Sequence, residues 1–238
     1  MIFTLEDRLS DSPFVERIWC AQSERTGELL SIAMSHWEMV VSRYQDKTYM
    51  TVRGPETKAT SLPVTIVGTE FFGIRFKVGT AMPYLPASTL VDGDVDLPDA
   101  SSKSFWLNGS AWQFPSYENA DTFVERLVRE DLLARDPVVE AALRGQLKNL
   151  SIRTARRHFL RTTGLTQKTI HQIERARYAV VLLQEGMSIL DVVYAADYFD
   201  QPHLTRSLKQ FIGQKPTEIM QKNESKQLSL LYKTEPLR

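Results

Sequence analysis

Two short segments near the C-terminal end of the chain carry the side-chain types that bind and read nucleic acids. In the segment 152–161, helical spacing puts Ile152, Ala155 and Phe159 on one face for the core and leaves arginines on the other faces. Arginine pairs with phosphates and also presents forked donors to O6 and N7 of guanine in the major groove. The residues predicted to contact DNA here are Ser151, Arg153, Thr154, Arg156, Arg157 and Arg161.

The second segment, 201–212, has the same organisation. Its apolar residues Leu204, Leu208, Phe211 and Ile212 form one stripe. In a recognition helix, Gln and Arg near the start reach base edges, whereas Thr and Lys suit phosphate oxygens. The predicted DNA contacts of this segment are Gln201, Pro202, His203, Thr205, Arg206 and Lys209.

A set of predicted helices must position these side chains. Their ranges are 138–147, 152–161, 168–184, 189–196 and 201–212, and Asp136, Ser151, Ser188 and Asp200 stand where N-caps are expected. They form two helix-turn-helix pairs around the helix 168–184, which spans roughly 26 Å. With the widths of the flanking pairs added, this length is commensurate with the ~34 Å between successive major grooves. One chain is therefore predicted to read two successive major grooves of double-stranded DNA.

The two halves of the chain differ in charge although the chain is neutral overall. Residues 1–136 hold 13 Lys and Arg against 20 Asp and Glu, whereas residues 137–238 hold 16 against 9. A basic half favours a polyanionic partner for that half, because phosphate neutralisation dominates sequence-independent affinity for nucleic acids. The alternative is a protein-interaction adaptor, in which the arginines are a solvated face and the helical module does not bind DNA.

The first 135 residues predict a different architecture. Short runs rich in β-branched and aromatic residues indicate strands at 29–34, 38–41, 48–52, 64–67 and 71–76. Such spacing predicts an antiparallel barrel or sandwich, completed by loops and short edge strands over 78–115. An amphipathic helix follows at 119–133, and its apolar stripe packs either on the barrel or on its copy in a homodimer.

The chain is thus predicted to be a multidomain α and β protein. Arg135-Asp136-Pro137 marks the border, because Asp136 can cap a helix and Pro137 suits its first turn. We expect a barrel-like domain at 1–135, an all-α double helix-turn-helix domain at 136–222 and a flexible tail at 223–238.

Aromatic residues of the first domain support two interpretations. Trp37, Phe76, Trp106 and Trp112 could line a barrel interior and enclose a small-molecule effector, or they could simply form the core. The sequence names no ligand for such a site.

The sequence offers no catalytic constellation, metal site or cofactor motif. His36 is the only histidine before residue 158, so the first domain cannot supply two histidines to a metal. Asp92, Asp94 and Asp96 lie in a polar stretch and are interpreted as solvated. No Gly-rich phosphate loop or nucleophile elbow is present. We therefore expect a protein that is not an enzyme.

The chain is expected to be cytoplasmic, with no membrane partner. No apolar run approaches the ~20 residues that cross a bilayer. The N-terminal segment carries acidic residues where a signal peptide carries basic ones. The single cysteine, Cys20, allows no intrachain disulfide, as is typical of a reducing compartment.

Several stretches of the second half carry a recognisable pattern. They are Leu150-Ser151-Ile152-Arg153-Thr154-Ala155-Arg156-Arg157-His158-Phe159 with Gly164, Arg175-Ala176-Arg177 with Leu182-Leu183, Ser188-Ile189-Leu190-Asp191-Val192-Val193, and 198–209 followed by Gly213 and Pro216. On these stretches, residues 138–221 resemble the DNA-binding domain of AraC/XylS-type transcription regulators. That resemblance implies two helix-turn-helix subdomains joined by a long helix.

The resemblance also assigns roles to individual residues. It implies that Arg153, Arg156 and Arg157 face bases in one groove, and that Gln201, Pro202 and Arg206 face bases in the next, with His203 and Thr205 against the backbone. Asp197 departs from the pattern, because the family usually has glycine in this turn. Asp tolerates positive φ better than most residues, so the turn is expected to survive at a cost of about 1 kcal/mol.

The first half resembles, more loosely, the barrel-like, cupin-like sensor domains that precede this module in many such regulators. The stretch that carries this likeness is Phe72-Gly73-Ile74-Arg75-Phe76 with Gly79. It implies control by an effector, dimerisation, or both. A regulator of this kind could also contact RNA polymerase.

Overall fold

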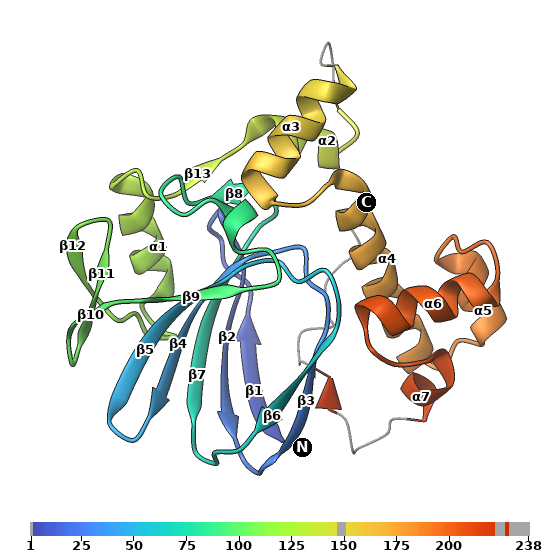
Figure 1. Cartoon of the computed structure of the whole chain (residues 1–238), viewed down its shortest axis with the longest axis horizontal. Helices are drawn as coiled ribbons and strands as arrows, with labels where there is room; N and C mark the ends of the chain where they lie inside the picture. Colours follow the sequence, from blue (N-terminus) through green and yellow to red (C-terminus); the bar gives the residue numbers. More distant parts are fainter. Residues whose placement is uncertain (1, 147–150, 222–226, 229–238) are drawn as a thin grey trace.

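The computed structural model describes residues 2–146, 151–221 and 227–228. An antiparallel β-sheet domain over residues 3–113 comes first, and a helical helix-turn-helix region follows it (Figure 1). The predicted fold class is thus confirmed: strands dominate the first part of the chain and helices the second. The sheet domain is compatible with a sandwich, and its strands are not assigned to a closed barrel.

The largest sheet has six antiparallel strands in the order β1-β2-β7-β4-β5-β9. Their bounds are β1 Phe3–Arg8, β2 Val15–Ser23, β4 Glu38–Tyr44, β5 Lys47–Arg53, β7 Glu70–Phe76 and β9 Asp94–Leu97. Because successive side chains on a strand point to opposite faces, the two faces of this sheet carry different residues. On β4, for example, Met39 and Val41 join the hydrophobic core, whereas Glu38 and Val40 point to the other face, where they line a cavity.

Smaller sheets complete the domain. Strands β3 (Gly27–Ser31) and β6 (Thr60–Val64) pair antiparallel, and β14 (Gln227–Leu228) adds to β3 in parallel. The remaining strands are β8 Thr80–Ala81, β10 Asp99–Ser101, β11 Ser104–Leu107, β12 Ser110–Gln113 and β13 Ala134–Arg135, with a short 3-10 helix η1 at Ala87–Thr89.

Helix α1 (Ala120–Arg129) buries its apolar stripe within the sheet domain. Phe123, Val124 and Leu127 belong to the same hydrophobic cluster as the core-facing residues of the large sheet. The ring of Phe123 meets that of Trp112 edge to face, with centroids 5.9 Å apart. Of the two sequence-based alternatives for this helix, the structure therefore supports packing on the sheet.

The C-terminal region is built of short helices around one long one. They are α2 Pro137–Leu143, α3 Ile152–Thr163, α4 Gln167–Gln184, α5 Ile189–Ala195, α6 Gln201–Phe211 and α7 Pro216–Met220. All four predicted N-caps are present: the side chains of Asp136, Ser151, Ser188 and Asp200 each accept a backbone N–H of the first helical turn. Helix α3 ends at Gly164, whose φ of 73° is left-handed.

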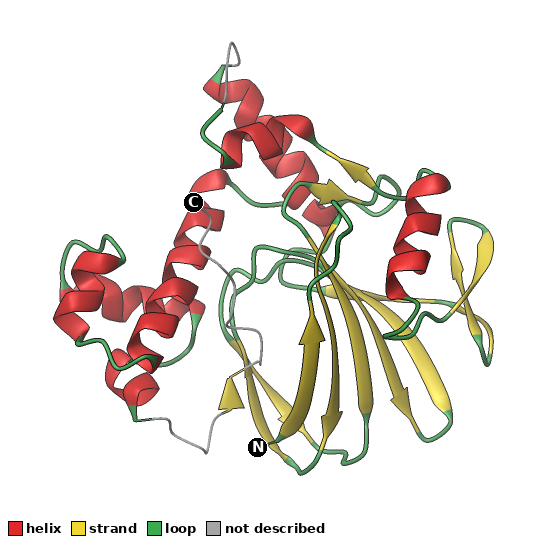
Figure 2. Ribbon diagram, turned by 180° about the vertical axis from the view of Figure 1, so that it is seen from behind, coloured by secondary structure: helices red, strands yellow, loops and turns green. Residues whose placement is uncertain are grey.

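The two parts of the molecule are packed against each other (Figure 2). Leu30, Ile32 and Ala33 belong to the hydrophobic cluster of the helical region. The Ala33 N–H donates to the carbonyl of Phe211 at 2.7 Å, and the Ala59 N–H donates to that of Gln210 at 2.9 Å. The end of α6 is therefore held on the sheet domain by both apolar contact and backbone hydrogen bonds.

Some elements differ from the sequence-based expectation. Strands β1 and β2 were not predicted, and β6 covers 60–64 rather than 64–67. Helix α2 ends at Leu143, short of the predicted 147, which itself lies outside the described residues. Most of the predicted tail 223–238 also lies outside them, but Gln227–Leu228 forms a strand where a flexible segment was expected.

Candidate nucleic-acid interface

Helix α3 turns one row of polar residues outward. Arg153, Arg156 and Arg157 are exposed, and their spacing of three and four places them on one face. Ser151 is exposed beside them and caps the helix, accepting the Thr154 N–H at 3.1 Å, while Thr154 itself is half-buried. Ala155 and Phe159 are buried, as predicted, but Ile152 is 88% exposed, so its assignment to the core is wrong. It lies in the first turn of the helix, beyond the reach of the core.

The carboxylate of Asp136 joins α2 to α3. It caps α2 through the N–H groups of Val138 and Val139, and its other oxygen accepts the Thr162 hydroxyl at 2.9 Å and lies 2.7 Å from His158 Nδ1. Burial alone would raise the pKa of Asp136, but these hydrogen bonds outweigh burial and lower it. One carboxylate thus bonds to both helices of the first pair, in addition to their apolar contacts.

Arg161 stands apart from the other arginines of α3. Its Nη2 lies 3.3 Å from the same Asp136 oxygen, yet 72% of its side chain is exposed. Asp136 is buried and has other partners, but the Arg161 guanidinium itself is largely in solvent, where a phosphate could reach it.

Helix α6 presents the second outward row. Gln201, Pro202, Arg206 and Lys209 are exposed, and Thr205 between them is half-buried. Leu204, Leu208 and Phe211 form the buried side of the helix, as predicted. The two proposed contact helices therefore share one design, in which an apolar back packs inward and cationic or amide side chains point to solvent.

His203 is half-buried and packs on the turn that precedes α6. Its ring meets Tyr198 edge to face at 5.2 Å, and its Nδ1 accepts the Phe199 N–H at 3.4 Å. The hydroxyl of Tyr198 lies 2.9 Å from that of Ser207. The His203 side chain therefore packs within the folded turn, in addition to its predicted contact with DNA.

Asp197 adopts the positive φ that the glycine of the resembled family would provide. Its φ is 55°, in the left-handed region. Arg175 of α4 donates to the Asp197 carbonyl at 3.1 Å, and its guanidinium lies 4.4 Å from the centre of the Tyr198 ring. The turn is thus supported from the long helix, which helps to explain how a non-glycine residue is accommodated.

Helix α4 joins the two pairs and is held in place by buried charges. Glu174 accepts the Ser35 hydroxyl at 2.5 Å, and Arg177 Nη1 donates to the Ala33 carbonyl at 3.2 Å. Both side chains are almost fully buried. At about 1.5 Å per residue, a helix of 18 residues is roughly 27 Å long. The spacing between the pairs is therefore set by a rigid element.

Comparison with known proteins identifies the helical region. Residues 147–222 match a protein-family model described as a helix-turn-helix domain. The chain carries an AraC-type helix-turn-helix domain. This match supports an AraC/XylS-type, DNA-binding transcription regulator, and it leaves the N-terminal domain unassigned. No curated protein and no solved structure matches the chain.

The four aromatic residues suggested for an effector do not meet around a cavity. Trp37 and Phe76 stack in the core with ring centres 4.1 Å apart, and Trp112 is buried against α1. Trp106 is 46% exposed. All four fall outside the lining of a cavity of about 450 Å³, which lies on the opposite face of the large sheet.

Other classes of site find no support in the described residues. Within residues 2–146, 151–221 and 227–228, no three His, Cys, Asp or Glu side chains gather in a way that could hold a metal ion. Over the same ranges, none of the helices has the length and apolar character to span a bilayer.

Proposed function

We propose that this protein is a sequence-specific DNA-binding transcription regulator in which α3 and α6 enter two successive major grooves. The observation that carries the proposal is the matched pair of capped helices, each with an apolar back and an exposed row of Arg, Gln or Lys. Base-reading roles are proposed for Arg153, Arg156, Arg157, Gln201, Pro202 and Arg206, and phosphate contacts for Ser151, Thr154, Arg161, His203, Thr205 and Lys209.

Selection of bound duplexes from a random pool, using the purified full chain, tests this proposal. Arg206→Ala should weaken the selected duplex by roughly 1 to 3 kcal/mol and relax preference at one half-site. Lys209→Ala should weaken selected and random duplexes alike. Arg129→Ala is the matched control, because Arg129 is an exposed arginine on α1 in the sheet domain. Equal losses on both duplexes for Arg206→Ala would refute its assignment to a base.

The adaptor alternative differs in its response to salt. Contacts to phosphates weaken steeply as ionic strength rises, because each contact releases condensed counterions. An apolar protein interface would respond only weakly. Failure to enrich any duplex, together with salt-insensitive capture of a protein, would favour the adaptor.

Several further properties stay predictions. They are control by an effector, homodimerisation, contact with RNA polymerase, cytoplasmic location, lack of enzymatic activity and the domain division at 135–136. The two-part architecture and the packing of α4 on the sheet domain are consistent with control of the helical region by the N-terminal one.

A further inference from the structure

A cavity of about 450 Å³ lies between the large sheet and strands β3 and β6. It opens on the sheet face that turns away from α1, so it is separate from the hydrophobic core described above. Its volume is within the range of small-molecule sites in proteins.

One end of the cavity is apolar. Phe3, Leu5, Leu62 and Phe71 contribute to its lining, which comes from β1, β6 and β7. Trp19 of β2 lies against Gly73, where a Cβ atom would come within 2.2 Å of the indole. The absence of a side chain at position 73 therefore leaves room for the indole, which lines the cavity.

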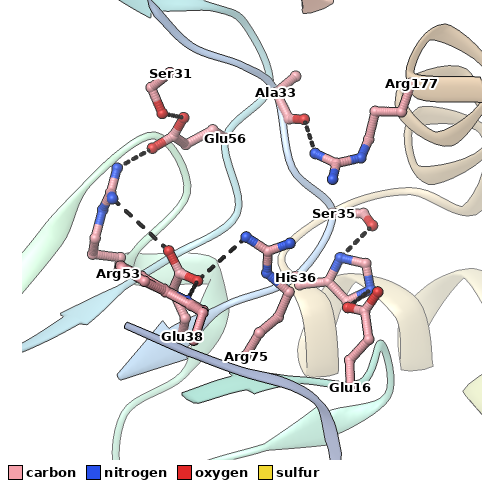
Figure 3. A network of polar contacts seen from close by, with 11 residues as sticks. Glu16, Ser31, Ala33, Ser35, His36, Glu38, Arg53, Glu56, Arg75 and Arg177 are labelled. Atoms are coloured by element: carbon pink, nitrogen blue, oxygen red, sulfur yellow. Dashed lines mark hydrogen bonds and ion pairs between the residues drawn. The ribbon is translucent and has the colours of Figure 1, made fainter. Parts of the chain in front are cut away.

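The other end of the cavity is charged, and Glu38 is at its centre (Figure 3). Its carboxylate accepts Trp19 Nε1 at 3.2 Å and Arg75 Nη2 at 3.4 Å, and Arg53 Nη1 lies 3.8 Å away. Arg53 is also paired with Glu56 at 2.6 Å. This end therefore has a fixed set of charges rather than mobile surface groups.

Arg75 is the unusual member of this set. Its side chain is buried, with 3% of its surface exposed. Even so, its Nε and Nη1 have no hydrogen-bond partner among the described residues. Buried donors of a charged group are costly when they remain unsatisfied. The charged residues of the described lining are three arginines, Arg53, Arg75 and Arg177, and one glutamate, Glu38. Arg53 and Arg177 already lie beside Glu56 and Glu174. The unpartnered donors of Arg75 therefore favour an anionic head group, since a charge-assisted bond to a carboxylate satisfies such donors best.

Arg177 connects this end of the cavity to the helical region. It belongs to α4, the helix between the two helix-turn-helix pairs, and it is 2% exposed. Its Nη1 donates to the Ala33 carbonyl (Figure 3). Its Nε lies 4.0 Å from Glu174, which accepts the Ser35 hydroxyl. A group bound beside Arg75 and Arg177 would therefore touch the contacts that hold α4 on the sheet domain.

We propose that this cavity binds a small amphipathic carboxylate, with its apolar body between β1, β6 and β7 and its head group on Arg75, and that Arg177 transmits binding to α4. The ligand half of this proposal stands independently of DNA binding. Its regulatory half rests on the proposed function.

Calorimetric titration of the full chain with a series of ω-phenylalkanoates, and with the alcohols of the same lengths, tests the ligand half. At least one carboxylate should bind, and its alcohol should bind roughly tenfold or more weakly. Arg75→Met should remove this difference. Arg43→Met is the matched control, because Arg43 lies on the neighbouring strand β4, pairs with Glu70 and is not part of the described lining.

A second variant keeps the test valid if Arg75→Met fails to fold. Val40→Phe adds a ring to the cavity lining and leaves the charged end unchanged, so it should abolish binding of carboxylate and alcohol alike. If no carboxylate of the series binds the wild-type chain, or if Val40→Phe binds as well as wild type, the cavity is not the site and the proposal fails.

Hydrogen exchange of α4 without DNA tests the transmission step. A bound carboxylate should slow or speed exchange of the amides at 167–184 in the wild-type chain, and Arg177→Met should reduce that change at saturating ligand. An unchanged α4 under saturation would refute transmission while leaving the ligand site intact. A change in α4 with no change in DNA affinity would instead count against the regulatory half, and a chain that binds no DNA at all would refute the proposed function alone.

Discussion

Gly164→Ala should destabilise the helical region more than the same substitution at Gly186. Both glycines follow helices and have left-handed φ values, 73° and 91°. An alanine in this conformation costs about 1 kcal/mol at either position. At Gly186 a Cβ atom would meet nothing within 4 Å. At Gly164 it would come within 2.5 Å of the Val91 side chain and 3.0 Å of the Ala87 carbonyl oxygen.

The second contact sets the magnitude. The Ala87 carbonyl belongs to the 3-10 helix η1 and cannot rotate away as a flexible side chain could. Overpacking of this kind typically adds about 1 to 3 kcal/mol. We therefore expect a loss of about 2 to 4 kcal/mol in the free energy of unfolding for Gly164→Ala, against about 1 kcal/mol for Gly186→Ala.

Urea unfolding followed by two signals measures this difference. All four tryptophans precede residue 113, so their fluorescence reports on the sheet domain, whereas circular dichroism at the helical band reports mainly on the C-terminal region. If the two parts are docked as the structure shows, the two transitions of the wild-type chain should coincide, and Gly164→Ala should separate them. Equal losses for both glycines, with coincident transitions, would contradict the packing of α3 on η1.

Three further substitutions or conditions give separate tests. Asp136→Asn should lower the free energy of unfolding by roughly 2 kcal/mol, because it removes the charge from a cap that also bonds α3. The difference between the variant and the wild type should disappear at a pH low enough to protonate Asp136. Asp197→Gly should raise the urea midpoint, by up to about 1 kcal/mol in stability, because glycine adopts φ near 55° without strain; an unchanged midpoint would mean that the Arg175 contact already offsets the cost. The pKa of Glu16, which burial alone would raise, is lowered to about 2 by the charge of His36 and the hydrogen bond from it, with help from Arg75 and Arg177. Since this pKa is below its unfolded value, the stabilisation is present above pH 4.5 and should be lost as pH falls toward 2, and Glu16→Gln should flatten that part of the stability profile.

The helical region could be predicted closely because its signals are local. Each N-cap side chain is within three residues of the N–H it accepts. Gly164, Gly186 and Gly213 follow the ends of helices and adopt the left-handed conformation that terminates them. The exposed rows of α3 and α6 follow from helical periodicity alone. Ile152 was misassigned because the same periodicity does not tell how far into the first turn the core extends.

The cavity could not be predicted because its residues come together only through strand pairing. Glu38, Arg53 and Arg75 lie on three strands, and Arg177 follows about a hundred residues later. Strand β1 was missed because Glu6, Asp7 and Arg8 interrupt its apolar pattern at an edge of the sheet, where polar side chains are common. Trp37, Phe76 and Trp112 lie in the core, since large aromatic residues mark a core as readily as a ligand site.

The most direct test of the central claim is the dependence of affinity on the distance between the two half-sites of a selected duplex. Inserting about 5 base pairs between them rotates the second groove by roughly half a turn, to the opposite side of the duplex. If α3 and α6 read successive grooves from one chain, the insertion should weaken wild-type binding at least tenfold. It should cost Arg206→Ala less, because that variant has already lost part of its specific contact with the second groove. Equal affinity of the wild-type chain for the original and the extended duplex would contradict the account.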